Sequence, residues 1–307
     1  MKIGFVSRIG EFPEKYWKDE FSIAKEQGVS HLELVVSYPF LGPSIYTETQ
    51  TREIKRLAKE ADVDLTIHLM PNQYDFTEQQ LVKMGASQEE RQRYLEQRTS
   101  LKDKTFDISI YDETTRDFSL SEVRKTIRMA REVGAKLIVI HGGKFNSLDD
   151  YKAHLDVSRK SLEEINQDLG DVKLCIENLP TMTHDGKHPR ELPINVEDIL
   201  YLVKGLENIG ICYDIGHGNV VSNALLYYSQ LKKSKKVWDM HIHDNKGDRD
   251  EHSPLKEGQI NFKEFISQLR REGYSGYLSI ELDTWCEAPE KMEKEQRIRA
   301  LEYIRKI

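Results

Sequence analysis

Residues 236–262 read KVWDMHIHDNKGDRDEHSPLKEGQINF, and this stretch joins a short apolar run to a polar loop. The apolar run predicts a buried strand, and the loop begins where that strand would end. Asp, Asn, Gly and Lys are ordinary loop residues, so the carboxylates alone would indicate only a surface loop. Three histidines among them favour a divalent-metal site of the zinc or manganese type. The candidate ligands are His241, His243, Asp244, Asp248, Asp250 and His252.

The same order of apolar run and polar segment recurs along the whole chain. Short apolar runs alternate with segments of helical periodicity, which predicts parallel strands connected by helices. Near-continuous apolar runs are typical of strands buried on both faces. The predicted strands are Lys2–Ser7, His31–Val36, Asp64–Leu69, Lys136–His141, Asp171–Glu177, Ile209–Asp214, Val237–His243 and Tyr277–Leu282.

Eight strand–helix units predict an α/β fold, a single closed (β/α)8 TIM barrel. An open, doubly wound sheet is the alternative, but no GxGxxG motif follows the first strand. The chain has 307 residues, more than the roughly 250 of a typical barrel of this kind. A helical insertion after the third strand, at about residues 72–106, accounts for much of the surplus. We therefore expect one domain over residues 1–307.

The centre of this insertion, Thr77–Asp103, is polar and helix-prone. The insertion follows the carboxyl end of the third strand and therefore begins on the mouth side of the barrel. We expect it to act as a lid or as a subunit contact. A homo-oligomer is therefore one expectation. After the insertion, the run Ser119–Glu122 (SLSE) predicts a capped helix start, and Gly134 predicts the end of that helix.

The composition restricts the classes of partner and compartment. The formal net charge is −7 and no Lys/Arg-rich run stands out, so no general attraction to nucleic acid is expected. The three cysteines lack paired spacing, which argues against a disulfide framework and favours a reducing cytoplasm. No signal peptide is recognisable, and no apolar stretch approaches the roughly 18 residues of a membrane span. We expect a cytoplasmic protein without a membrane partner.

Six consecutive predicted strands each present a potential metal ligand at or just beyond the carboxyl end. In a closed barrel these ends converge on one mouth, where active sites form. Burial of so many carboxylates without cations would cost a large free energy. Glu33, inside the second strand, could face the barrel interior and support a ligand. The strand-end candidates are His68, His141, Glu177, Asp214, His217, His241 and Glu281.

These strand ends carry a family resemblance. The chain resembles the xylose isomerase-like barrel superfamily, which joins sugar isomerases and epimerases with the type IV apurinic/apyrimidinic endonucleases. The resemblance extends from the third strand onward. The motifs are IHLMP (His68), VIHGG (His141), IENLP (Glu177), YDIGH (Asp214, His217), HIHDNKGDRDEHSPLKEG (His241, Asp250, His252) and IEL (Glu281).

The resemblance to the isomerases and epimerases implies one central metal ion, with Glu177, Asp214, His241 and Glu281 as its ligands. Manganese, magnesium, cobalt or zinc would bind two neighbouring oxygens of a small carbohydrate and stabilise an enediolate. Glu177 and Glu281 would be the catalytic acid and base that exchange a proton at carbon. The substrate-binding candidates are Lys144, Lys246 and Arg249 for a phosphate, His243 as a further mouth residue, and Trp285 for a sugar pocket.

The resemblance to the endonucleases implies up to three zinc ions. His68, His141 and Glu177 would form a first site, and the central ligands a second. His217, Asp250 and His252 would form a third, and such a trinuclear centre suits hydrolysis of phosphodiesters at abasic DNA.

The sequence also departs from the endonuclease pattern, and these departures argue against endonuclease activity. ENLPT stands where the endonucleases carry an ENTAGQ-like run, and the chain is acidic overall. The sequence therefore favours a metal-dependent isomerase or epimerase of a sugar, sugar phosphate or cyclitol, with one to three Zn²⁺ or Mn²⁺ ions. Abasic-site endonuclease activity is the alternative, and only that alternative implies a nucleic-acid partner.

Overall fold

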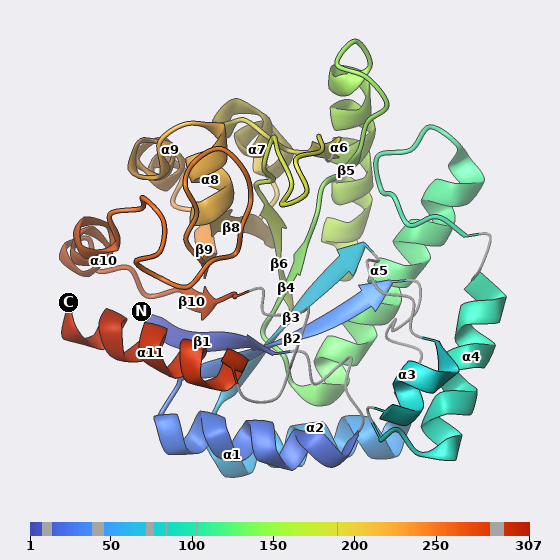
Figure 1. Cartoon of the computed structure of the whole chain (residues 1–307). Coiled ribbons are helices and arrows are strands. Elements are labelled where there is room, and N and C mark those ends of the chain that lie inside the picture. The colour runs from blue at the N-terminus through green and yellow to red at the C-terminus, as the bar shows by residue number, and fades with distance from the viewer. Residues whose placement is uncertain are drawn as a thin grey trace.

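A computed structural model describes residues 1–7, 14–38, 46–71, 77–83, 85–101, 104–188, 190–282 and 292–307. Its centre is a closed barrel of parallel strands in the order β1-β10-β9-β8-β6-β4-β3-β2 (Figure 1). Because β1 pairs with both β2 and β10, the sheet has no edge there, which confirms the barrel and excludes the open sheet. The strands are β1 Lys2–Ser7, β2 His31–Tyr38, β3 Asp64–Pro71, β4 Leu137–Ile140, β6 Lys173–Glu177, β8 Ile209–Asp214, β9 Val237–Ile242 and β10 Tyr277–Ile280.

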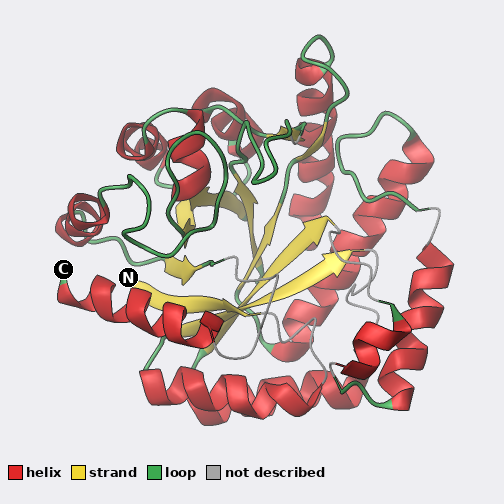
Figure 2. Cartoon of the chain, viewed as in Figure 1, coloured by secondary structure: helices red, strands yellow, loops and turns green. Residues whose placement is uncertain are grey.

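Helices surround the barrel on its outside (Figure 2). The outer helices are α1 Trp17–Gln27, α2 Glu48–Ala61, α5 Glu113–Val133, α6 Tyr151–Asp168, α7 Val196–Val203, α9 Ala224–Leu231, α10 Phe262–Arg271 and α11 Met292–Lys306. Short elements add the 3₁₀ helices η2 Glu14–Tyr16 and η4 Lys232–Ser234, helix α8 Ile215–Val221, and the two-stranded sheet of β5 Gly143–Lys144 and β7 Glu191–Leu192. Among the described residues, none of the helices has the length and apolar character to cross a membrane.

Helix α5 begins earlier than its sequence pattern predicts. Its N-cap is Asp112, whose side chain accepts a hydrogen bond from the backbone N–H of Thr115 at 2.8 Å. Ser119 lies inside the helix and donates its hydroxyl proton to the carbonyl oxygen of Thr115. The predicted start at Ser119 is therefore wrong, because a serine near a glutamate satisfies the capping pattern wherever it occurs, and Asp112 provides the actual cap.

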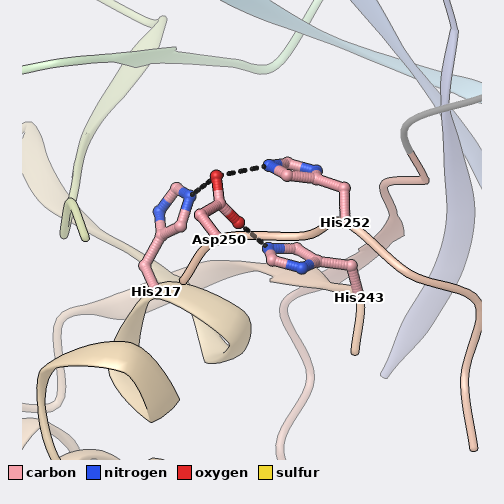
Figure 3. Close-up of side chains that lie close together, drawn as sticks. All are labelled: His217, His243, Asp250 and His252. Carbon is pink, nitrogen blue, oxygen red and sulfur yellow. Dashed lines mark ion pairs between the residues drawn. The ribbon is translucent and has the colours of Figure 1, made fainter. Parts of the chain in front are cut away.

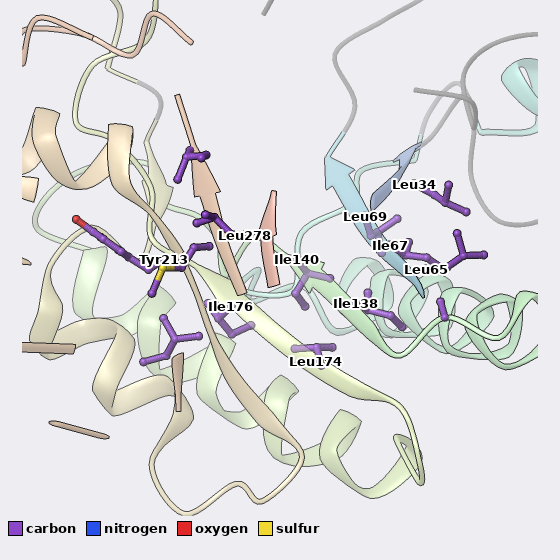
Figure 4. Close-up of a cluster of buried hydrophobic side chains, with 14 of the residues drawn as sticks. Leu34, Leu65, Ile67, Leu69, Ile138, Ile140, Leu174, Ile176, Tyr213 and Leu278 are labelled. Carbon is purple, nitrogen blue, oxygen red and sulfur yellow. The ribbon is translucent and has the colours of Figure 1, made fainter. Parts of the chain in front are cut away.

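Successive side chains along each strand point alternately outward, toward the helices, and inward, into the barrel. The outward side chains form an outer core, and the inward ones fill the barrel interior. Figure 4 shows apolar side chains of the outer core, which fill the layer between strands and helices. The residues between them point inward. At one end of the interior they form a small apolar cluster of Leu137, Val139, Cys175, Cys212 and Tyr277. Toward the carboxyl ends of the strands, the inward positions are instead histidines and carboxylates, which are also buried.

The two helices of the insertion are α3 Glu78–Lys83 and α4 Gln88–Leu101. Figure 1 shows them on the side of the molecule toward which β2 and β3 point. The backbone N–H of Glu14, in η2, donates to the carboxylate of Glu90, in α4, at 2.9 Å. The predicted helical insertion after the third strand is thus present. Its role as a lid or as a subunit contact stays a prediction.

A buried ion pair connects helix α11 to helix α1. Arg297 donates to both carboxylate oxygens of Glu20 at 2.7 and 3.1 Å. Burial would raise the pKa of Glu20, but Arg297 outweighs it and the pKa is lowered. The pair therefore stabilises the fold fully above the unfolded-state pKa and loses this effect as the pH falls through the lowered pKa.

We expect Glu20→Gln to cost about 3–5 kcal/mol at neutral pH, because it removes the charge of a carboxylate that pairs with a buried guanidinium. Urea unfolding at a series of pH values measures this, and the difference from the natural chain should shrink on acidification. Glu295→Gln, which breaks an exposed pair with Arg299 on the same helix, is the control and should leave unfolding unchanged. A Glu20→Gln difference that is independent of pH would contradict the prediction.

Candidate metal centre

Four side chains meet at the carboxyl ends of β6, β8, β9 and β10. Their ligand atoms all lie within 4.8 Å of one another. His241 is central, with Nδ1 at 2.9 Å from Glu281 Oε2 and 3.4 Å from Glu177 Oε1. The register of β8 and β9 sets Asp214 directly opposite His241. We call Glu177, Asp214, His241 and Glu281 the central group, and they are the four residues predicted as central ligands.

A second cluster shares Glu177 with the central group. His68 Nε2 lies 3.2 Å from Glu177 Oε2, and His141 Nε2 lies 3.5 Å from the same oxygen. His68 lies within β3, three residues before its end, and His141 directly follows β4. We call His68, His141 and Glu177 the side group. The structure thus brings together the three residues predicted for a first zinc site.

A third cluster lies around Asp250, and Figure 3 shows its four side chains. His252 Nε2 and His217 Nε2 lie 3.1 and 3.4 Å from Asp250 Oδ2, and His243 Nε2 lies 3.7 Å from Asp250 Oδ1. His217 is carried by the short helix α8, which the sequence patterns missed. We call His217, His243, Asp250 and His252 the outer group. It contains the three residues predicted for a third site, with His243 added.

The charges of these groups depend strongly on one another. Burial would raise the pKa of Glu177, but His241 and His68 hold it well below its usual range. Burial would lower the pKa of His252, but Asp250 raises it to about 10. For His217, Asp214 and Asp250 likewise overcome burial and raise the pKa. The buried carboxylate of Glu177 is therefore negatively charged and faces imidazoles that can supply compensating positive charge.

The polar contacts behind the histidines fit metal ligation. His217 Nδ1 lies 2.9 Å from the carbonyl oxygen of Asn178, which can only accept, so Nδ1 carries a proton and Nε2 is the nitrogen that would bind an ion after losing its own proton. His241 Nε2 lies 2.8 Å from Glu33 Oε1, and His141 Nδ1 lies 3.5 Å from Glu191 Oε2. An oxygen behind the ligand histidine is the usual arrangement at metal sites.

Several buried ligand atoms approach one another closely without hydrogen-bond geometry. Among the described residues these include His68 Nε2, Glu177 Oε2, His241 Nδ1, Asp250 Oδ1 and Glu281 Oε2. Buried polar atoms without hydrogen bonds are uncommon and call for a cause such as a bound ion. Imidazole and carboxylate donors suit zinc and manganese. The chain's residues therefore fit a divalent metal ion.

The residues predicted to bind a phosphate or a sugar are not gathered at the central group. Lys144 Nζ lies 3.9 Å from Glu191 Oε1. Lys246 and Arg249 are exposed and pair with Glu251 and Asp248 of their own loop. The structure thus does not gather these three cations around the central group, and Trp285 lies outside the described residues. Their binding of a phosphate or a sugar stays a prediction.

Two supporting residues differ in how well the sequence predicts them. Glu33 has the inward position that its place in β2 predicts, and it contacts His241. Glu191, behind His141, was missed. It belongs to the two-residue strand β7, which pairs with β5, and so short a strand has no periodicity to recognise.

A closed barrel with buried histidine and carboxylate clusters at its mouth defines a class of metal-site TIM barrels. A profile of the xylose isomerase-like TIM barrel family matches residues 21–307. The chain therefore belongs to this family, whose characterised members include sugar epimerases and endonuclease IV.

Individual relatives agree with this assignment. An uncharacterized protein of Methanocaldococcus jannaschii is 33% identical over 177 residues, 55% of this chain and 58% of that protein. A probable endonuclease 4 of Metamycoplasma arthritidis is 25% identical over 169 residues, 51% of this chain and 59% of that protein. The chain thus spans less than two thirds of these curated relatives. Among solved structures, the crystal structure of a D-tagatose 3-epimerase-like protein superimposes on this chain with a TM-score of 0.72 and a sequence identity of 23%. The match covers 100% of this chain and 96% of that one, and it supports the fold.

Glu33 provides a test of metal binding at the central group. We expect Glu33→Ala to weaken metal retention about 10- to 100-fold, because the ring of His241 loses the carboxylate that orients it. Glu33→Gln keeps an oxygen acceptor in place and should weaken retention less. Competition with a chromophoric chelator measures the affinity, and Glu207→Ala, an exposed position, is the control. Unchanged affinity in Glu33→Ala would refute this role.

Proposed function

We propose that this chain is a divalent-metal-dependent isomerase or epimerase of a sugar, sugar phosphate or cyclitol. The observation that carries the proposal is the pair Glu177 and Glu281 on either side of His241. The two glutamates come from β6 and β10, which are separated in the barrel by β8 and β9. Both are buried and both face the same group of ligand atoms. Isomerisation and epimerisation require such a pair, since one group removes a proton from carbon and another returns one.

Each residue of the central group has a defined part in this proposal. Asp214, His241, Glu177 and Glu281 would hold the ion, which supplies charge stabilisation to substrate oxygens. Glu33 holds the ring of His241 from behind, at 2.8 Å. The low pKa values of Glu177 and Glu281 leave both carboxylates ionised, so either can accept the first proton from carbon. The other glutamate would have to take up a proton from solvent before it could return one to carbon.

The catalytic pair is tested by proton exchange. We expect Glu177→Gln and Glu281→Gln each to abolish exchange of solvent deuterium into a bound sugar substrate, because an amide cannot accept the proton. NMR of the substrate in D₂O measures exchange, and circular dichroism checks that the fold survives. Glu251→Gln, in the loop after β9, is the control variant. Near-normal exchange in either glutamine variant would remove that glutamate from the acid/base pair.

Abasic-site endonuclease activity is the second candidate, and one observation favours it. The side and outer groups adjoin the central group, so the ligands for a three-metal centre lie together. Such a centre suits phosphodiester hydrolysis, because one ion activates water and the others stabilise the developing charge. The resemblance to a probable endonuclease 4 agrees with this candidate.

Metal stoichiometry and a nicking assay separate the two candidates. A single exchangeable manganese-type ion per chain, measured by mass spectrometry, would exclude the trinuclear nuclease. Incubation of the metal-loaded protein with a duplex that contains one abasic site gives the second measurement. We expect no nicking and proton exchange with a carbohydrate. Three tightly held zinc ions together with nicking would overturn the isomerase proposal.

A further inference from the structure

We propose that His243 is the fourth protein ligand of a metal ion in the outer group, which makes this site a closed one. The inference rests on metal binding at the barrel mouth but not on which reaction the chain catalyses. His217, Asp250 and His252 alone would leave a four-coordinate ion with an open position for water or substrate. A third imidazole fills that position, so the outer ion would serve structure and would not take part in chemistry.

The first support is the direction in which His243 points. It directly follows β9, two residues after His241, and its side chain is fully buried. Its ring stacks on the ring of His252, with centroids 3.9 Å apart and an angle of 7° between the planes. In Figure 3 the side chains of His217, His243 and His252 all direct a nitrogen toward Asp250. Three imidazoles and one carboxylate thus each offer a ligand atom, and these atoms lie within 4.8 Å of one another. Because the rings of His243 and His252 are parallel, they would have to turn from this arrangement for both nitrogens to bind one ion.

A glycine makes room for this ring. Gly216 precedes His217 at the start of α8, and a Cβ atom added there would lie 2.0 Å from His243 Cε1 and 2.4 Å from its Nε2. Any larger residue at position 216 would displace the imidazole from the outer group. The position of His243 is therefore set jointly by β9 and by the first turn of α8.

His243 also reaches the central group. Its Nε2 lies 3.0 and 3.1 Å from the two carboxylate oxygens of Asp214. Asp214 Oδ1 additionally accepts a hydrogen bond from the backbone N–H of His217 at 2.6 Å. If His243 turns from Asp214 to an outer ion, Asp214 keeps this backbone bond and gains free lone pairs for a central ion.

A closed outer site would also fix the long loop after β9. Asp250 and His252 lie in this loop, whereas His217 lies in α8, so one ion would join the two segments. The loop is held elsewhere by the antiparallel bridge between Asp244 and Ser253 and by the hydrogen bond from Asp250 N–H to the carbonyl oxygen of Met182. An ion bound by four protein ligands has no vacant tetrahedral position, so it is less suited to bind a phosphodiester oxygen than an ion with three.

The test compares zinc binding in His243→Asn, Gly216→Ala and Asp250→Asn with the natural chain. Zinc content is measured by mass spectrometry after dialysis against graded chelator. We expect each variant to lose the same single ion, with its Kd raised more than about tenfold, since even loss of an outer-shell partner costs 10- to 100-fold. His184→Asn, an exposed loop histidine, is the control and should lose none.

Cobalt substitution reports the coordination number. The difference between the visible spectra of the Co²⁺-loaded natural chain and the Co²⁺-loaded His243→Asn variant should show the intense bands of a four-coordinate ion. If His243 only orients Asp214, His243→Asn and Asp250→Asn would weaken different ions, and the double variant would lose two. That result, or a difference spectrum with the weak bands of a higher coordination number, overturns the proposal. Loss of one ion in the double variant supports it, whatever activity the chain has.

Discussion

Glu177 is the group on which the barrel mouth depends, because it is a buried carboxylate that four histidines approach. His68, His141, His217 and His241 each bring a ring nitrogen within 3.5 Å of one of its oxygens. A carboxylate that is 1% exposed must be compensated by nearby positive charge. The surrounding imidazoles, and a divalent ion that they would hold, provide this compensation. The outer apolar layer leaves the inward positions free for these polar side chains.

Asp214 connects the parts of the site through several interactions of one side chain. It ends β8, caps α8 through the N–H of His217, and contacts the ring of His243. The cap sets the direction in which α8 leaves the barrel, and so it sets where His217 lies. A residue proposed as a metal ligand is therefore also the local determinant of the helix that carries an outer ligand. The central and outer groups cannot be rearranged independently.

The coordination of the outer group bears on the choice between the two candidate functions. An outer ion with an open position is suited to bind a phosphate oxygen, whereas an ion surrounded by four protein ligands is suited to hold a loop against the barrel. His243 decides between these two cases, since His217, Asp250 and His252 are common to both. The glutamate pair of the central group is compatible with proton transfer in either case.

The sequence by itself determined the parallel α/β class, because eight apolar runs with helices between them predict strands that are buried on both faces. It favoured a closed barrel over an open sheet, and the pairing of β1 with β10 in the tertiary structure decided for the barrel. It also indicated the strand-end ligands, since alternation and strand polarity bring them to one mouth. The start of α5 at Asp112, the helix α8 and the support of His141 by Glu191 were not predictable, because caps and two-residue strands have weak local signals. Only the tertiary structure joined His243 to His217, Asp250 and His252, since this depends on Gly216 of another segment leaving space for the ring.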